Sequence, residues 1–137
     1  MFDIYGFASS ALAFVVAFVA AGLFTVAFKV IYQWATPYHE AKLIREGNTS
    51  AAIALGGALL GYVIPLASAL SHTISLIEFC AWAALAGVIQ IAAFTIIRMI
   101  VMKDVSARIE RGEVAAGVYL ASISLAVGML NAACMTS

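Results

Sequence analysis

Five polar side chains lie inside long apolar runs of this sequence, and they are the first candidates for chemistry: Thr25, Ser68, Glu78, Gln90 and Asn131. Polar groups are expensive to place at membrane depth, so they are functional candidates by default. Together they are the candidates for a polar path that would conduct an ion, a proton or a small solute. Two alternatives stay open. Glu78 suits a first-turn cap or an interfacial carboxylate, and Gln90 and Asn131 suit hydrogen bonds between helices.

Other reactive residues form no recognisable site. His39 and His72 fall in different connections, and Cys80 and Cys134 lack the spacing of a metal knuckle or a redox pair. Both cysteines fall near helix ends that we expect outside, where oxidation is feasible, but buried free thiols are the favoured interpretation. With no nucleophile–base pair and no phosphate-binding loop, we expect no enzyme activity, no metal and no cofactor.

The composition is that of a membrane protein. Apolar residues make up 65% of the 137 residues and charged residues 10%, against about 45–50% and about 25% in soluble proteins. A soluble fold of this length could not bury so much apolar surface. The bilayer is therefore the expected partner. The net charge of zero offers no basic face for nucleic acid.

Four apolar runs, at residues 8–34, 50–70, 77–102 and 114–135, are each long enough to cross about 30 Å of hydrocarbon. Only helices or closed barrels satisfy the backbone in lipid, and these runs are too long for barrel strands. The sequence predicts an all-α integral membrane protein with a single transmembrane domain over residues 1–137. No Lys or Arg precedes the first run, so we expect a retained helix and not a signal peptide.

The basic residues predict the orientation. All seven flank the first and third connections: Lys29, Lys42, Arg45, Arg98, Lys103, Arg108 and Arg111. The positive-inside rule then places both of these connections in the cytoplasm and both termini outside, in the periplasm of a bacterial inner membrane protein.

An internal repeat is predicted by a single gapless offset. It pairs Gly47 with Gly112 and Ile44 with Ile109, and it makes Thr25 and Gln90 equivalent positions. We interpret the chain as two helical hairpins, repeat 1 over about residues 8–71 and repeat 2 over about residues 74–136. Both hairpins enter the membrane from the same side, so the repeats are parallel.

Each basic connection is expected to contain a short interfacial helix. In the first, Thr36 is the expected N-cap, Pro37 the first helical residue, and Gly47 with Asn48 a left-handed stop. In the second, Asp104 is the expected start and Gly112 the stop. The first connection also supplies a cytoplasmic clamp that we expect to contact lipid or a partner: Thr36, Pro37, Lys42, Arg45, Gly47 and Asn48.

Small residues mark close helix packing. The second run carries Gly56, Gly57 and Gly61, and the fourth carries Ser124 and Gly128. This spacing lets two helix backbones approach each other in lipid. Packing within one chain is the favoured interpretation, and contact between protomers is the alternative. Aromatic residues at the inner boundary are typical of an interfacial belt: Tyr32, Trp34 and Tyr38.

Four strings together resemble one family. They are TPY-x-E-x-x-L-I-R-x-G-N at residues 36–48, AIALGG at 52–57, IPL at 64–66 and SLAVGMLNAACM at 124–135. They are similar to the YjfL-type inner membrane proteins, known as domain of unknown function 350. His39 departs from the acidic residue expected after TPY. The resemblance implies a small bacterial inner membrane protein of paired helices without an established activity, near envelope-stress proteins of the phage-shock type. It assigns no catalytic residue.

The sequence therefore favours a non-enzymatic membrane component. We expect it to act through homo-oligomers or through partners in envelope maintenance or stress, with phage-shock-type membrane proteins as candidate partners. The alternative is an oligomeric pore or a small-solute or ion transporter, in which the five polar residues line a shared path.

Overall fold

The computed structural model describes residues 3–36, 38–101 and 104–135, and those residues form helices and no strand. The elements are α1 (Ile4–Ala35), α2 (Glu40–Arg45), α3 (Thr49–His72), α4 (Leu76–Ile96), the π-helical turn η1 (Ile97–Val101), α5 (Val105–Glu110) and α6 (Val114–Met135). Four of them, α1, α3, α6 and α4 continued into η1, are long and apolar enough to cross a membrane. The predicted all-α membrane fold is confirmed.

The predicted spans differ from the helices mainly at the ends. The first helix begins at Ile4 instead of residue 8, because the Asp3 side chain accepts a hydrogen bond from the Tyr5 amide and caps it. The third span ends in a turn of π-helix, which the apolar pattern does not indicate. The duplication of the hairpins stays a prediction.

The central contact joins α3 to α6 through backbone atoms. A Cβ added at Gly57 would collide with Ala121, and one added at Gly61 with the Ser124 carbonyl. Likewise, a Cβ at Gly128 would collide with the Gly61 carbonyl. All three therefore lie where the two helices are in direct contact, backbone against backbone at Gly61 and Gly128, and against the Ala121 methyl group and backbone at Gly57. Gly56 is different: a Cβ there would meet nothing within 4 Å, so within this chain Gly56 is not a packing position.

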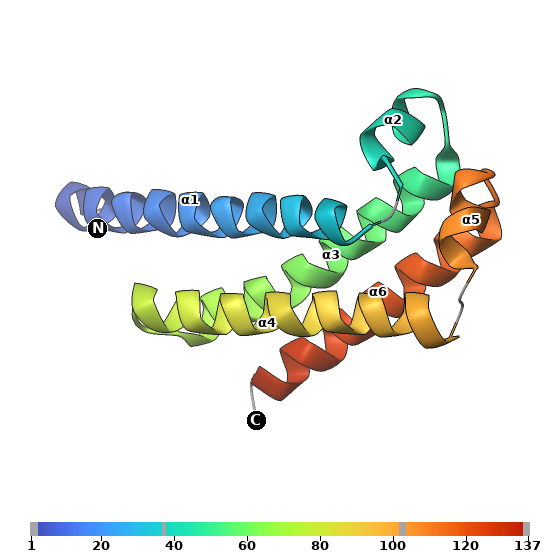
Figure 1. The fold of residues 1–137 in the computed structure, drawn as a ribbon. Coiled ribbons are helices and arrows are strands. Elements are labelled where there is room, and N and C mark those ends of the chain that lie inside the picture. The colour runs from blue at the N-terminus through green and yellow to red at the C-terminus, as the bar shows by residue number, and fades with distance from the viewer. Residues whose placement is uncertain (1–2, 37, 102–103, 136–137) are drawn as a thin grey trace.

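The other two long helices pack on this pair unequally. The Phe28 and Tyr62 rings stack with centroids 4.4 Å apart, and Tyr62 Oη donates to the Ala83 carbonyl at 3.0 Å, which joins α1, α3 and α4. Yet α1 buries only Phe28 and Tyr32. Figure 1 shows α1 at the edge of the molecule, while α3 and α6 run together through its middle.

Both short helices lie at the same end of the bundle, opposite the N-terminus and the α3–α4 turn (Figure 1). We call it the α2–α5 end. The predicted left-handed stops are confirmed at Gly47, with φ +85°, and at Gly112, with φ +81°. Asp104 is the N-cap residue of α5, as expected. Whether this end faces the cytoplasm stays a prediction.

Two details of the first connection differ from the prediction, and a third, at Pro37, is not tested. His39, not Thr36, precedes α2; Thr36 instead ends α1, and its hydroxyl donates to the Tyr32 carbonyl at 2.7 Å. Asn48 is not part of a left-handed stop, because its φ is −76° and it caps the start of α3. Pro37 lies outside the described residues. A proline after Thr36 indicated a cap there, but Thr36 and His39 both have extended backbone angles and α2 begins only at Glu40.

Adjacent glycines give a matched test of the α3–α6 contact. We expect Gly57→Ala to lower the free energy of unfolding by about 1–3 kcal/mol, because the new methyl group would force the helices apart. Gly56→Ala should leave stability unchanged or raise it by at most about 1 kcal/mol, since alanine has less backbone freedom to lose. Unfolding titrations in mixed micelles measure both. Equal effects of the two substitutions would contradict this packing.

Candidate functional site: a buried polar cluster beside α2

The five polar residues predicted to line a path have separate local partners. Gln90 Nε2 donates to the Ser124 carbonyl at 3.3 Å, and Asn131 Nδ2 donates to the Ala86 carbonyl at 3.3 Å, so both join α4 to α6. Ser68 Oγ reaches the Ala132 carbonyl at 3.4 Å, between α3 and α6. Thr25 donates to the Ala21 carbonyl in its own helix. Glu78 is exposed, in the first turn of α4. These side chains therefore do not line one common surface within the described chain.

A different set of polar side chains is gathered at the α2–α5 end. Tyr32 from α1, Tyr38 and Glu40 from the first connection, and Arg98 from η1 form what we call the Glu40 cluster. Glu40 is 2% exposed, and both tyrosines are buried as well. It is the one buried acidic side chain in the described parts of the chain.

Aromatic packing positions this cluster. The Tyr32 ring lies 4.5 Å from the Phe94 ring, and the Arg98 guanidinium lies 4.5 Å from the Phe94 ring centroid. A cation above an aromatic face is attracted by the ring quadrupole. Tyr32 is held in the last turn of α1, which the Thr36 hydroxyl closes. These contacts bring the ends of α1 and α4 to the first residue of α2, which points inward.

Burial dominates the electrostatics of Glu40. It raises the pKa of the Glu40 carboxyl to about 7, although the approach of the Tyr32 and Tyr38 hydroxyls and the charges of Lys29 and Arg98 each lower it. Burial, and then the nearby Glu40 carboxylate, raise the pKa of Tyr38 well above its usual range. An uncharged carboxyl is favoured because the ionised form loses its hydration.

The cluster has unused hydrogen-bonding capacity. Both Glu40 carboxylate oxygens, Tyr32 Oη, Tyr38 Oη and Arg98 Nη1 are buried, and none completes a well-formed hydrogen bond within the described residues. Buried polar atoms are nearly always paired, so such a concentration marks a site where a proton, a water or a movement is needed. One acid, two phenols and one guanidinium fit proton exchange better than metal binding. Among the described residues no group of three His, Cys, Asp or Glu side chains is placed to hold a metal.

An open pocket of about 690 Å³ lies beside the cluster. Tyr38 and Glu40 form part of its lining, together with Trp34, His39, Lys42 and Arg45. Glu40 therefore lies at the boundary between the buried cluster and an open pocket. Three residues of the predicted clamp line the same pocket: Thr36, Lys42 and Arg45.

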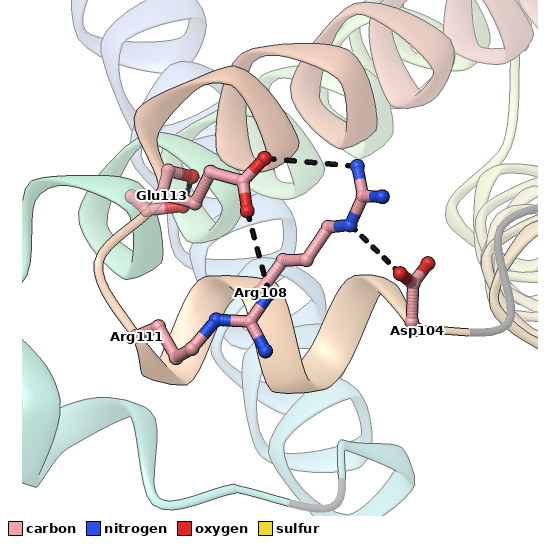
Figure 2. A network of polar contacts seen from close by, with 5 residues as sticks. Asp104, Arg108, Arg111 and Glu113 are labelled. Carbon is pink, nitrogen blue, oxygen red and sulfur yellow. Dashed lines mark hydrogen bonds and ion pairs between the residues drawn. The ribbon is translucent and has the colours of Figure 1, made fainter.

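The two connections use their basic residues differently. Lys42 and Arg45 are exposed and form no ion pair with any described residue. In the other connection, Arg108 Nε lies 2.8 Å from Asp104 Oδ2, and Glu113 lies 3.6 Å from both Arg108 Nη1 and Arg111 Nη2 (Figure 2). Arg108 and Arg111 are thus paired with acidic residues of their own connection, whereas Lys42 and Arg45 are exposed without such partners among the described residues.

Asn48 joins the two connections. Its Oδ1 accepts from the Ala51 amide at 2.9 Å and caps α3, and its Nδ2 donates to the Ile109 carbonyl at 2.8 Å at the end of α5. Ser50 Oγ donates to the Glu113 carbonyl at 2.7 Å nearby. One amide thus satisfies the orphan groups of two helix ends that lie far apart in the sequence.

Sequence reasoning missed the Glu40 cluster. The sequence places Tyr32 and Tyr38 in an expected interfacial belt and Arg98 among the charges that predict the orientation, and it does not single out Glu40. One signal was available: the repeat offset that pairs Gly47 with Gly112 pairs Glu40 with Val105 and Arg98 with Gln33. These two charges have no charged counterpart in the other half. For the cysteines, Cys80 is half-buried and Cys134 is exposed, so the expectation of two buried thiols is wrong for Cys134.

Comparison with known proteins agrees with this architecture. The family described as Domain of Unknown Function (DUF350) matches residues 6–135. The proteins named "UPF0719 inner membrane protein YjfL" from Escherichia coli K12 and from Escherichia coli O157:H7 are each 41% identical over 127 residues, which cover 93% of this chain and 96% of the relative. No solved structure matches.

Two substitutions separate the functions of Asn48. Asn48→Ser keeps a good capping oxygen but is too short to reach Ile109, so we expect it to cost about 1 kcal/mol of unfolding free energy. Asn48→Ala loses the cap as well and should cost about 2 kcal/mol. Unfolding titrations of both variants provide the check. If the two variants had the same stability as the unsubstituted protein, the link between the connections would carry no energy.

Proposed function

Since this chain belongs to the family described as Domain of Unknown Function (DUF350), we propose that it is a non-enzymatic component that binds a partner in the maintenance of the cell envelope. It is a multi-pass inner membrane protein, as its four apolar helices and its similarity to the inner membrane protein YjfL indicate.

The observation that carries the proposal is the exposed cationic pair Lys42 and Arg45. Within the described residues neither has an ion-pair partner, and both line the pocket beside α2 together with Trp34, which is 80% exposed. Arg108, in contrast, is held by two acidic side chains of its own connection. A basic, aromatic surface at a membrane boundary suits an acidic partner, and each cation contributes about 1 kcal/mol near an anionic surface.

Two further parts of the proposal concern the assembly and the setting. A homo-oligomer is supported by α1, which leaves nearly all of its surface uncovered within one chain. The setting in envelope stress, with phage-shock-type membrane proteins as partners, rests on the family resemblance alone. An oligomeric pore has less support, because Gln90 and Asn131 donate their hydrogen bonds to neighbouring helices.

Charge reversal tests the partner-binding surface. We expect the double variant Lys42→Glu/Arg45→Glu to lose, by tenfold or more, the cross-links formed in cells by a photoreactive residue at Ala41. The expected reason is repulsion of the acidic partner. Arg111→Glu is the matched control, since it reverses an exposed cation on the other connection. Undiminished cross-linking in the double variant, with the protein still folded, would refute the proposed surface.

Cysteine labelling tests the orientation on which this surface depends. In a variant with Cys80 and Cys134 replaced by alanine, we expect Ile74→Cys to react with an impermeant maleimide added outside the cell. Ile74 is fully exposed in the α3–α4 turn. Ala41→Cys should react only after the inner face is opened. The reverse pattern would place α2 in the periplasm and overturn the orientation.

A further inference from the structure

We propose that the Glu40 cluster is a proton-binding site whose occupancy controls how tightly the start of α2, which packs on α3, is held against Tyr32 of α1 and Arg98 of η1. The inference is independent of the proposed partner, because it concerns only groups within this chain. Glu40 is the first residue of α2, the short helix that also carries Lys42 and Arg45, so a change in its charge acts on the surface that these two residues form.

Geometry makes the uncharged carboxyl the form that fits. Glu40 is 2% exposed, and both of its oxygens lack a completed hydrogen bond among the described residues. A neutral carboxyl has an O–H to donate to a phenol oxygen and keeps an oxygen that accepts from the other phenol. An ionised carboxylate in the same place loses its hydration without an equivalent replacement. The phenol oxygens of Tyr32 and Tyr38 are the nearest partners for either form.

The surrounding charges do not neutralise an ionised Glu40. Four groups act on it: Tyr32 and Lys29 from α1, Tyr38 from the connection, and Arg98 from η1. Both cations favour ionisation, yet no ion pair joins either of them to Glu40 in the described structure. Arg98 lies over the Phe94 ring instead, and its Nη1 has no partner. Ionisation therefore favours entry of water or an outward movement of α2.

The direction of the pH effect follows from linkage. The pKa of Glu40 rises from 4.5 to about 7 when the cluster is formed, so the docked state binds the proton more tightly than the released state. Docking is strongest below about pH 4.5 and weakens as the pH rises through about 7, by about two orders of magnitude in the docking equilibrium. The pocket beside α2, which Glu40 lines, provides the route for the proton.

Infrared spectroscopy of the full-length protein in lipid nanodiscs tests proton binding. We expect the absorption of a buried protonated carboxyl to disappear with a midpoint near neutral pH, and to be missing in Glu40→Gln. The matched control is Glu46→Gln, which removes an exposed carboxylate just after α2 and should leave the titration unchanged. No carboxyl titrating near neutral pH in the unsubstituted protein, or an unchanged titration in Glu40→Gln, would overturn the proposal.

Tyr38→Phe provides a test that does not depend on the folding of Glu40→Gln. The Tyr38 hydroxyl lowers the pKa of Glu40, so its removal should move the midpoint to higher pH. A midpoint that stays in place would show that the titrating group lies elsewhere.

Spin labels test whether the ionisation of Glu40 loosens α2. A label at Ala41, in a protein without Cys80 and Cys134, should become more mobile as the pH rises through the midpoint. A label at the exposed Ala107 on α5 should not respond, because that connection has no buried acid among its described residues. In Glu40→Gln the Ala41 label should stay immobile at every pH. Mobility that does not change with pH in the unsubstituted protein would rule out the coupling.

Discussion

The close approach of the α3 and α6 backbones is the constraint on which the other contacts depend. At Gly57, Gly61 and Gly128 the helices are in direct contact. In lipid, where apolar attraction does not drive helices together, such contact and a few polar bonds supply the association. A Cβ at Gly117 would likewise collide with Ser50, so the two backbones also approach closely near the start of both helices. Asn48, just before α3, lies within hydrogen-bonding reach of the end of α5 there.

The sequence predicted the elements well because their signals are local. Hydrophobic length located all four spans, and Gly47 and Gly112 marked the ends of the short helices through backbone freedom that only glycine has. The small residues of the second and fourth runs also pointed to close packing. Gly56 shows the limit of that pattern: it is adjacent to Gly57 in the chain but faces open space, because the rotation of the helix about its axis depends on the partner helix.

The Glu40 cluster was not predictable in the same way. Its members come from three separate parts of the chain, and their burial results from how α1 and α4 converge at α2. The same holds for Asn48, whose residue type suits a turn or a cap equally well. Charge counting also failed to distinguish the connections, since both have basic and acidic residues. Whether an arginine pairs internally, as Arg108 does, is decided by side-chain placement after folding (Figure 2).

The unequal packing of α1 has a mechanical consequence. This helix has 32 residues and so is about 48 Å long, well beyond the roughly 30 Å of hydrocarbon in a bilayer. It must tilt or project from the membrane. Only Phe28 and Tyr32, near its C-terminal end, are buried. Further contacts, such as the edge-to-face packing of Phe24 on Phe79 of α4, extend along its C-terminal half, so a change in bilayer thickness acts mainly on its uncovered N-terminal half.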